Sequence, residues 1–505
     1  MLKIILFIIF LTQVCEAYKI LVVFPMPGES HAFLGAGITK HLVEAGHEVT
    51  FITRYPNTKN KNNLLREIDI SSLMKNVNKF DPKGIISLME HFVKTHASLF
   101  EHENVKKLFD DPKEHFDVVI AEWMFDELMS GMAAIFNCPL IWVSTVDPHW
   151  TLLRLIDEIP NPSYNGDAIS RAVVPFTFTQ RLQELLKLIL GFSLQHFYIA
   201  RLEHKEYNNL IVPMIQKRGH KIPDYEELRY NASLILGNSH VSLGHSIRLP
   251  QNYKAIGGYH VDSDVKPLPE NLKKILDNSK NGLIYFSMGT NLRSKHWPAT
   301  IKENLLKIFG KLKQTVLWKF EEDLPNRPSN VHIVQWAPQQ SILAHPNCIL
   351  FITHGGLLST TEATHFGKPI IGIPVFGDQF TNVDRAVNRG FAKKVDLSYN
   401  VADDLGEAIH DILTDERYGA KAKELSLIYH DRPVPPSKEL VHWMEHVIRT
   451  GGAPHLRSPA LLVPWYQKLY LDLVVTIFVI IYAFKMMFRK VKRMFTKNLG
   501  KIKTN

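Results

Sequence analysis

A histidine, a pair of glycines and several polar side chains stand at regular places between residues 351 and 382. An apolar run ends at His354-Gly355-Gly356, a helix-length segment carries Glu362, and a second apolar run precedes Asp378-Gln379. Glycines let a ligand approach the backbone, and the free N–H groups and dipole of the following helix favour an anion there. The pattern predicts a βαβ unit that binds a diphosphate.

The polar side chains of this segment also suit a nucleotide sugar. His354 can donate a hydrogen bond to a phosphate oxygen, and Glu362, about two helical turns further on, can accept bonds from both hydroxyls of a ribose. Asp378 and Gln379 follow the next strand, at the edge where open α/β sheets bind ligands. Their acceptors and donors suit the hydroxyls of a sugar.

These residues resemble the signature of the UDP-glycosyltransferases, a family that transfers a sugar from a UDP-sugar to a small lipophilic acceptor. Upstream, Trp336-Ala337-Pro338-Gln339 resembles the start of that signature, and Phe286–Asn291 resembles the family's phosphate loop. The resemblance implies that Trp336 stacks on uracil and that Gln339 meets its polar edge. The UDP-sugar-binding residues that it implies are Gly289, Thr290, Trp336, Gln339, His354, Gly355, Gly356, Ser359, Glu362, Asp378 and Gln379.

One position departs from the family's pattern. Many relatives carry a polar residue, often Asn, where this chain has Leu358, which predicts that one phosphate contact is missing. The local sequence Gly-Leu-Leu-Ser-Thr-Thr-Glu resembles arthropod members, and this resemblance implies UDP-glucose as the donor. UDP-glucuronate or another hexose donor stays open.

Sugar transfer to a hydroxyl needs a base, because a neutral alcohol is a poor nucleophile, and a positioned base contributes roughly 10²–10⁴ in rate. His31 lies in the expected loop after the first strand, where the resembling family has its catalytic histidine. Glu122 follows the run Val118–Ala121, where many relatives carry Asp, and would orient the second ring nitrogen of His31. The two residues are predicted to catalyse an inverting displacement.

The sequence predicts neither a metal nor another cofactor, and the UDP-sugar is a co-substrate. His354 and the amides of Gly355-Gly356 would offset the charge of the leaving diphosphate. His442 and His446 have the spacing of an inverted zinc-peptidase motif, but a helix face near the membrane segment explains them better. Neither half carries a Gly-x-Gly-x-x-Gly turn after its first strand, which argues against a dinucleotide cofactor.

The elements that must position these residues alternate between strand and helix patterns, in one series from Ile20 and a second from Leu283. Such alternation predicts an α/β chain with parallel sheets. The resemblance implies the GT-B fold, two Rossmann-like domains that face a cleft. Within a long helical stretch from Thr179 to Ile215, an apolar stripe is expected to be mainly core, although this half must also hold the acceptor. The stripe consists of Leu182, Leu185, Leu186, Ile189 and Leu190.

The two ends of the chain predict a secreted or membrane topology. Small residues Cys15 and Ala17 follow an apolar stretch, as in a signal peptide. Leu469–Phe488 is uncharged apart from Asp472 and Lys485 and predicts one transmembrane helix. Because its uncharged core is shorter than the roughly 20 residues of a typical span, an interfacial helix is the alternative.

The expected organisation is a signal peptide (1–17), an N-terminal acceptor-binding domain (18–256), a linker (257–270), a C-terminal UDP-sugar-binding domain (271–450), a membrane-proximal segment (451–468), a transmembrane helix (469–488) and a basic cytosolic tail (489–505). The positive-inside rule would place the catalytic domains in the lumen of the endoplasmic reticulum. Asn231-Ala232-Ser233 is a possible glycosylation site there.

Composition narrows the function further. The chain has 505 residues, enough for large cores, and most of its formal net charge of +9 lies in the tail, which leaves no footprint for nucleic acid. Its three cysteines provide no disulfide framework. The sequence therefore predicts a membrane-anchored UDP-glycosyltransferase for a small lipophilic acceptor, of undetermined oligomeric state. A catalytically lapsed UDP-sugar-binding protein and, more remotely, a sugar-nucleotide epimerase are the alternatives.

Overall fold

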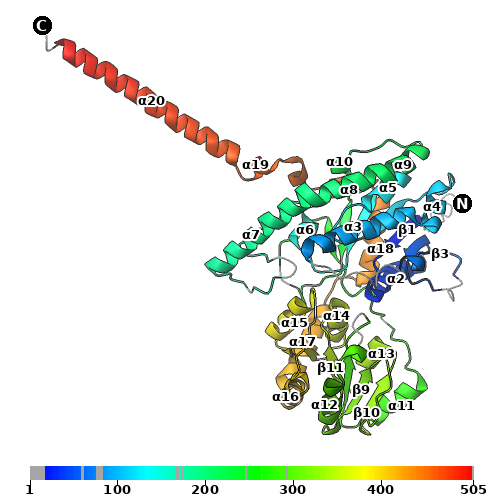
Figure 1. Ribbon diagram of the computed structural model, residues 1–505. Helices are drawn as coiled ribbons and strands as arrows, with labels where there is room; N and C mark the ends of the chain where they lie inside the picture. Colours follow the sequence, from blue (N-terminus) through cyan, green and yellow to red (C-terminus); the bar gives the residue numbers. More distant parts are fainter. Residues whose placement is uncertain are drawn as a thin grey trace, which may run out of the picture. The chain divides into compact units, whose positions relative to one another are not determined.

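The computed structural model describes residues 17–57, 62–74, 84–166, 170–172, 174–244, 247–262, 264–290 and 294–502. The chain forms two compact units, Met1–Arg457 and Ser458–Asn505. The first unit contains two parallel sheets, each with helices on both faces (Figure 1). This arrangement confirms the predicted α/β class with two Rossmann-like domains. The predicted signal peptide falls almost wholly outside the described residues.

The first sheet has seven parallel strands in the order β3-β2-β1-β4-β5-β6-β7. They are β1 (Lys19–Phe24), β2 (Glu48–Thr53), β3 (Leu65–Asp69), β4 (Val118–Trp123), β5 (Leu140–Ser144), β6 (Leu234–Gly237) and β7 (Tyr253–Ala255). β1 lies between β2 and β4, so that Ile20 pairs with Val49 on one side and Val118 on the other. Near-continuous apolar runs such as that of β1 are typical of parallel strands covered on both faces.

Helices cover both faces of this sheet. They include α2 (Glu29–Glu44), α3 (Ile85–Glu101), α4 (Glu103–Asp110), α5 (Ser130–Phe136), α6 (Trp150–Leu153) and α10 (Tyr225–Arg229). α2 packs on one face, where Leu34 and Ile38 join a buried core with β1 and β4. α3, α4 and α5 pack on the other face, in a core that includes Phe100 and Met132.

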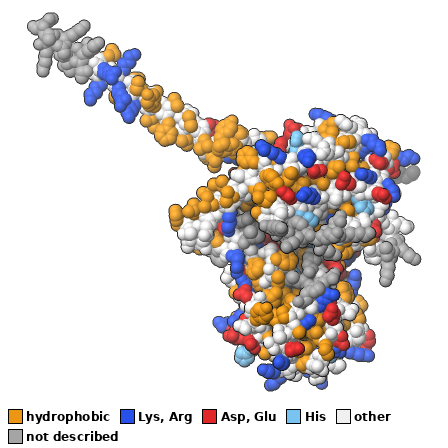
Figure 2. Space-filling model, in the orientation of Figure 1, with side chains coloured by type: hydrophobic (Ala, Val, Ile, Leu, Met, Phe, Trp, Pro, Cys, Tyr) orange, Lys and Arg blue, Asp and Glu red, His pale blue; other side chains and the backbone are white. Residues whose placement is uncertain are grey.

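A long helical segment runs from Phe178 to Lys217. It consists of α7 (Phe178–Leu194), η2 (Gln195–Ile199), α8 (Ala200–Glu206), η3 (Tyr207–Ile211) and α9 (Val212–Lys217). The apolar stripe on α7 that was expected to be core is exposed to solvent, and Figure 2 shows hydrophobic side chains gathered along this helix. The expectation was wrong because α7 contacts the domain through a different stripe, where Glu184 is buried and Gly191 lies against the ring of Trp150.

The second sheet has six parallel strands in the order β10-β9-β8-β11-β12-β13. They are β8 (Leu283–Ser287), β9 (Thr315–Lys319), β10 (Val331–Val334), β11 (Cys348–Thr353), β12 (Ile370–Gly372) and β13 (Ala392–Lys394). The helices that follow the sequence of this half are α11 (Glu270–Asn278), η4 (Ser294–His296), α12 (Ala299–Gly310), α13 (Gln339–Ala344), α14 (Leu357–His365), α15 (Gln379–Asn388), α16 (Val401–Thr414) and α17 (Glu416–His430). Two buried clusters, one on each face, form its core.

After α17 the chain returns to the first sheet. α18 (Pro436–Arg449) packs beside α2, and its Leu440, Met444 and Val447 belong to the same buried core as Leu34 and Ile38. The sequence placed residues 436–450 in the second domain, and the structure places this helix on the first. The prediction followed the order of the chain, but the position of α18 depends on where its apolar face is buried. That face packs beside α2.

The first unit ends just after η5 (Pro454–Leu456). The second contains η6 (Pro459–Leu462), α19 (Trp465–Lys468) and α20 (Leu471–Ile502). Within α20, the segment Leu471–Met494 has a mean hydropathy of 2.1, and its most apolar stretch is not buried against the rest of the chain. The segment is long and apolar enough to cross a membrane. The helix begins two residues after the predicted start of the span and continues into the basic tail.

Candidate functional site

The predicted catalytic pair is in direct contact. Glu122 is the fifth residue of β4 and fully buried, and its Oε1 accepts a hydrogen bond from Nδ1 of His31. His31 lies in the first turn of α2 rather than in the loop that the sequence predicted. β1 and β4 are neighbours in the sheet, so the elements that follow them meet at one edge. The contact leaves Nε2 as the ring nitrogen of His31 that can exchange a proton with a ligand.

The charge around His31 is set by both sheets. Burial acts to lower the pKa of His31, but the carboxylate of Glu122 and the more distant one of Asp378 outweigh burial, so the pKa lies above its ordinary value. Asp378 precedes α15 in the second sheet's half and accepts a hydrogen bond of 2.8 Å from Asn382. Burial raises the pKa of Asp378, and the charge of His31 opposes that rise. The predicted base therefore lies within electrostatic reach of a predicted sugar-binding residue.

The predicted phosphate site is built around the ring of His354. A Cβ atom at Gly289 would come within 2.6 Å of Cε1 of His354, and one at Gly356 within 2.5 Å of Nε2. A side chain at position 289 or 356 would therefore crowd the ring of His354. Gly289 and the neighbouring Gly355 have positive φ values of +80° and +79°, which glycine adopts readily. Gly356 precedes α14, whose first N–H groups are open to an anion. Thr290, half-buried, directly follows Gly289.

His354 is an uncharged donor in this site. Burial lowers its pKa to about 4, and the neighbouring Lys319 ammonium adds to that effect. Lys319 ends β9 and its Nζ donates a hydrogen bond of 2.9 Å to the carbonyl of Gly289. Sequence reasoning missed this lysine. Its position at the carboxyl end of the strand beside β8 is the signal that could have found it.

Glu362 is buried and already bound on both oxygens. Gln339 Nε2 donates to Oε2 at 2.6 Å and to Ser359 Oγ at 3.2 Å, while Gln340 Nε2 donates to Oε1 of Glu362 at 3.1 Å. Burial raises the pKa of Glu362 and the two amides oppose the rise. The structure thus joins three predicted residues and adds Gln340, whose side chain positions the carboxylate.

Two further predicted residues differ in how much they can offer a ligand. Trp336 is 66% exposed in the loop before α13 and presents an open ring face. Gln379 is buried, and its Oε1 accepts hydrogen bonds from the backbone N–H groups of Val375 and Phe376, at 2.9 and 3.1 Å. Only the amide NH₂ of Gln379 is left to bind a sugar hydroxyl.

Leu358, where many relatives carry a polar residue, has a packing role in the structure. Its side chain packs against the buried cluster that α2, α18 and the first sheet share. An asparagine there would lose this apolar contact with the other sheet's half. The departure from the family's pattern therefore exchanges a polar group for hydrophobic contact between the two halves of the first unit.

α15 binds the first sheet's half directly, just beyond the two predicted sugar residues at its start. Arg385 forms an ion pair with Asp147, which lies in the loop after β5. Asp384 pairs with Arg171 at 2.7 Å, and Arg389 donates to the carbonyl of Val241 at 3.0 Å. These contacts connect the placement of Asp378 to the loops of the first sheet.

A hollow of about 690 Å³ lies elsewhere, at the amino ends of β5 and β6. Its described lining includes Asn231 of the possible glycosylation site and Cys138, and it includes none of the predicted site residues. Among the described residues, no group of three or more His, Cys, Asp or Glu side chains is arranged to hold a metal ion.

Comparison with known proteins agrees with this geometry. The family model described as "UDP-glucoronosyl and UDP-glucosyl transferase" matches residues 59–504. The chain is 33% identical to UDP-glycosyltransferase UGT5 of Dactylopius coccus, over 92% of this chain and 89% of that protein. It is 30% identical to UDP-glucuronosyltransferase 2A2 of Mus musculus, over 72% and 67% of the two chains.

Solved structures share the fold at low sequence identity. The calicheamicin glycosyltransferase CalG4 superposes with a TM-score of 0.59 at 14% identity, covering 86% of this chain and 99% of that one. The glycotransferase of kitacinnamycin gives a TM-score of 0.57 at 16% identity, over 86% and 100%. These likenesses confirm the GT-B fold. With the family model matching most of its length, the chain belongs to the UDP-glucoronosyl and UDP-glucosyl transferase family and is a UDP-glycosyltransferase.

Proposed function

We propose that the protein transfers glucose from UDP-glucose to a hydroxyl of a small lipophilic acceptor, with inversion at the anomeric carbon. The observation that carries the proposal is the His31–Glu122 hydrogen bond within electrostatic reach of Asp378. It provides a base at the edge of one sheet and a sugar-binding carboxylate from the other. A lapsed binding protein would not need the two to be brought together.

In the proposed reaction, Nε2 of His31 accepts the proton of the acceptor hydroxyl as its oxygen attacks the anomeric carbon. A new C–O bond forms on one side of this carbon, and the bond to UDP breaks on the other, so the electron pair leaves with UDP. The buried carboxylate of Glu122 stabilises the imidazolium that results. Because Glu122 is fixed within β4, it also holds the ring in one orientation.

The leaving diphosphate would be held by groups of the second sheet. His354 is uncharged and donates one N–H, the start of α14 offers backbone N–H groups, and Lys319 supplies a positive charge. These groups act on charge that grows as the bond to UDP breaks. They would therefore stabilise the transition state more than the bound donor.

The nucleoside and sugar would be bound on either side of the diphosphate. Trp336 would stack on uracil, Gln339 would meet its polar edge, and Glu362 would accept from the ribose hydroxyls. A carboxylate has about four lone-pair positions, so Glu362 can bind ribose while it keeps its glutamine partners. Asp378 and the NH₂ group of Gln379 would bind the sugar hydroxyls.

The donor is proposed to be UDP-glucose for two reasons. One matching relative from Dactylopius coccus is named UDP-glucosyltransferase 2, at 33% identity over 92% of this chain. In addition, glucuronate would bring a second carboxylate towards Asp378, and like charges repel at short range. UDP-glucuronate is the alternative donor, in keeping with the mammalian relatives.

We further propose that α20 crosses the membrane of the endoplasmic reticulum once, with the catalytic unit in the lumen and the basic tail in the cytosol. The apolar length of Leu471–Met494 and the basic residues that follow support this orientation. Glycosylation of Asn231, which is exposed, would report a luminal position. A glycosidase-sensitive change in mass that disappears in Asn231→Gln would test it.

The activity is tested by measuring UDP release from membranes that contain the full chain. UDP-glucose, UDP-glucuronate and UDP-galactose are each supplied with a simple phenol, beside membranes with His31→Ala. Release that requires phenol and His31 establishes the transferase and identifies its preferred donor. If UDP binds but no donor gives release with a panel of phenols and alcohols, the binding-protein alternative replaces the proposal.

A further inference from the structure

The start of the linker between the two sheets, residues 257–262, is bound by the helix that carries the predicted base. On α2, Nε2 of His41 donates a hydrogen bond of 2.7 Å to the carbonyl of Tyr259, and Lys40 forms an ion pair with Asp262. The side chain of Tyr259 is buried in the core that α2 shares with β1 and β4. These contacts fix the position of the linker on the first sheet's half.

The same part of the linker is bound to the donor site through Gln340. Nε2 of Gln340 donates to the carbonyl of His260 at 3.2 Å and to Oε1 of Glu362 at 3.1 Å. The side-chain oxygen of Gln340 accepts the backbone N–H of Asp262 at 3.0 Å. Both N–H groups and the oxygen of this amide are therefore engaged. The linker backbone and the carboxylate of Glu362 share one support, so a shift of one disturbs the other.

The side chain of His260 is buried beside that carboxylate without a hydrogen-bond partner. It is 3% exposed, and neither Nδ1 nor Nε2 has such a partner among the described residues. Nε2 lies 3.8 Å from Oε1 of Glu362, which is beyond hydrogen-bond length. Burial lowers the pKa of His260 to about 4, so the ring is neutral and carries one N–H. Buried polar groups are rarely left unpaired, so this side chain needs an explanation.

The surroundings of Glu362 provide one. Its two oxygens accept hydrogen bonds only from the neutral amides of Gln339 and Gln340, and burial raises its pKa. A further N–H directed at Oε1 would favour the ionised carboxylate, which can accept bonds from both ribose hydroxyls. Nε2 of His260 is the ring nitrogen that faces Oε1, and an approach of about 1 Å would make the bond.

We propose that His260 is a positioning residue of the donor site: when UDP is bound, its Nε2–H donates a hydrogen bond to Oε1 of Glu362 and keeps the carboxylate ionised and directed at the ribose hydroxyls. The inference rests on the proposed role of Glu362 as the ribose ligand. Because the same linker is bound to α2, it joins the ribose carboxylate to the helix that carries His31.

Two other roles for His260 fit the structure less well. A ring that only fills space beside Tyr259, whose ring centre lies 6.0 Å away, would not need two nitrogens. A charged imidazole paired with Glu362 is opposed by burial and by the nearby His365. The roles also differ in what they predict: a space-filling ring affects every ligand of the site equally, whereas the proposed bond affects only ligands that carry ribose hydroxyls.

The test measures the binding of UDP and of 2′,3′-dideoxy-UDP, which lacks both ribose hydroxyls, to the full chain in detergent by calorimetric titration. His260→Phe should raise the Kd for UDP about five- to tenfold, as for the loss of one hydrogen bond, and leave the Kd for the dideoxy analogue unchanged. His260→Gln, whose amide N–H can replace Nε2–H, should retain most of the affinity.

The matched control is His47→Phe. His47 is 1% exposed and its Nε2 lies 3.2 Å from a carboxylate oxygen of Glu445, but it belongs to the first sheet's half. This variant should bind both probes as the wild type does. Combining His260→Phe with Glu362→Gln should weaken UDP binding no more than Glu362→Gln alone, because His260 acts through Glu362.

Equal weakening of both probes by His260→Phe would indicate a structural role and overturn the proposal. Unchanged UDP binding in His260→Phe, while Glu362→Gln weakens it, would overturn the proposal and leave the proposed role of Glu362 intact. Unchanged UDP binding in both variants would contradict that role, and the inference would fail with it. None of these outcomes depends on sugar transfer.

Discussion

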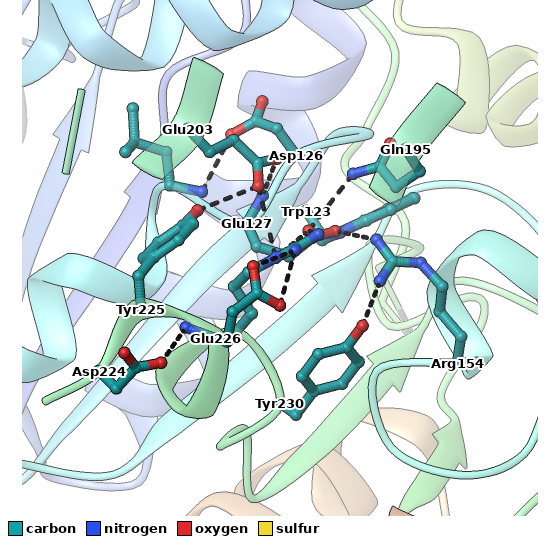
Figure 3. A network of polar contacts seen from close by, with 12 residues as sticks. Trp123, Asp126, Glu127, Arg154, Gln195, Glu203, Asp224, Tyr225, Glu226 and Tyr230 are labelled. Atoms are coloured by element: carbon teal, nitrogen blue, oxygen red, sulfur yellow. Dashed lines mark hydrogen bonds and ion pairs between the residues drawn. The ribbon is translucent and has the colours of Figure 1, made fainter. Parts of the chain in front are cut away.

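Glu122 and Glu127 are both fully buried, only five residues apart, and the structure treats them in opposite ways. Glu127 is neutralised by two arginines. Its Oε1 lies 2.8 Å from Arg154 (Figure 3), and its Oε2 lies 2.6 Å from Arg229. Glu122 has one imidazole partner on Oε1, and its Oε2 has no hydrogen-bond partner among the described residues. One carboxylate is compensated in full and the other only in part.

The difference separates a structural carboxylate from one that is available for chemistry. The charge of the arginines overcomes burial and holds the pKa of Glu127 at about 2, so it stays ionised. Burial and the negative charge of Glu127 raise the pKa of nearby Glu203 well above its ordinary value, although Arg229 opposes that rise. Isolated buried charge is costly, so a half-compensated carboxylate such as Glu122 is retained where it has a task. In the proposed mechanism, that task is to orient His31 and to stabilise its protonated ring.

The largest expected effect comes from removing the base. His31→Ala should lower the transfer rate by roughly 10²–10⁴, because the acceptor then loses its proton without a positioned base. UDP affinity should stay within error, since the donor groups lie on the other sheet. Single-turnover rates and UDP titration measure the two quantities. His41→Ala, on the same helix, is the control, and undiminished turnover in His31→Ala would remove His31 from the mechanism.

Removing the charge of Glu127 should destabilise the protein rather than affect catalysis directly. Glu127→Gln leaves the buried Arg154 without its carboxylate and removes the nearest carboxylate from Arg229, which should cost about 3–5 kcal/mol of stability. The thermal midpoint in detergent measures the loss. Glu226→Gln removes an exposed ion-pair partner of the same Arg229, at 3.1 Å, and should cost about 0–1 kcal/mol. Equal midpoints for the two variants would contradict the distinction between the networks.

The role of Glu122 can be tested by measuring how the transfer rate depends on pH. In the proposed mechanism the neutral imidazole of His31 is the base. Because Glu122 raises the pKa of His31, the wild-type rate should climb with pH through that raised pKa and then level. Glu122→Gln removes the raising charge and should move the rising limb to lower pH while it lowers the plateau. Rate profiles between pH 5 and about 9 would show both changes. A lower plateau with an unmoved limb would mean that Glu122 does not set the charge of His31.

The smallest expected effect concerns the donor site. Glu362→Gln keeps the size of the side chain but weakens its bond to ribose hydroxyls, and the KM for the donor should rise about tenfold, or about 1.4 kcal/mol. Steady-state kinetics at saturating acceptor measure it. Gln340→Ala removes a support of Glu362 without touching the proposed ligand and should have a weaker effect. A larger effect of Gln340→Ala would identify Glu362 as mainly structural.

Much of the site could be foreseen because its residues follow strands in one βαβ unit. Chain connectivity alone brings His354, Glu362 and Asp378 to the carboxyl edge of the second sheet. Lys319 and Gln340 were missed because neither belongs to a spacing pattern. Lys319 becomes visible only once β9 is known to lie beside β8, and Gln340 once α13 is known to face Glu362.

The sequence by itself determined the alternation of strands and helices, the signature from His354 to Gln379, and through that signature the resemblance to the family. These properties are local, since they depend on residues within a few turns of one another. The contact between His31 and Glu122 was also predicted, and the structure contains it. Only the tertiary structure decided that α18 returns to the first sheet, that Leu358 packs across the two halves, and that the stripe on α7 faces outward. Each depends on which surfaces meet after folding, and an apolar face in a sequence does not reveal what will cover it.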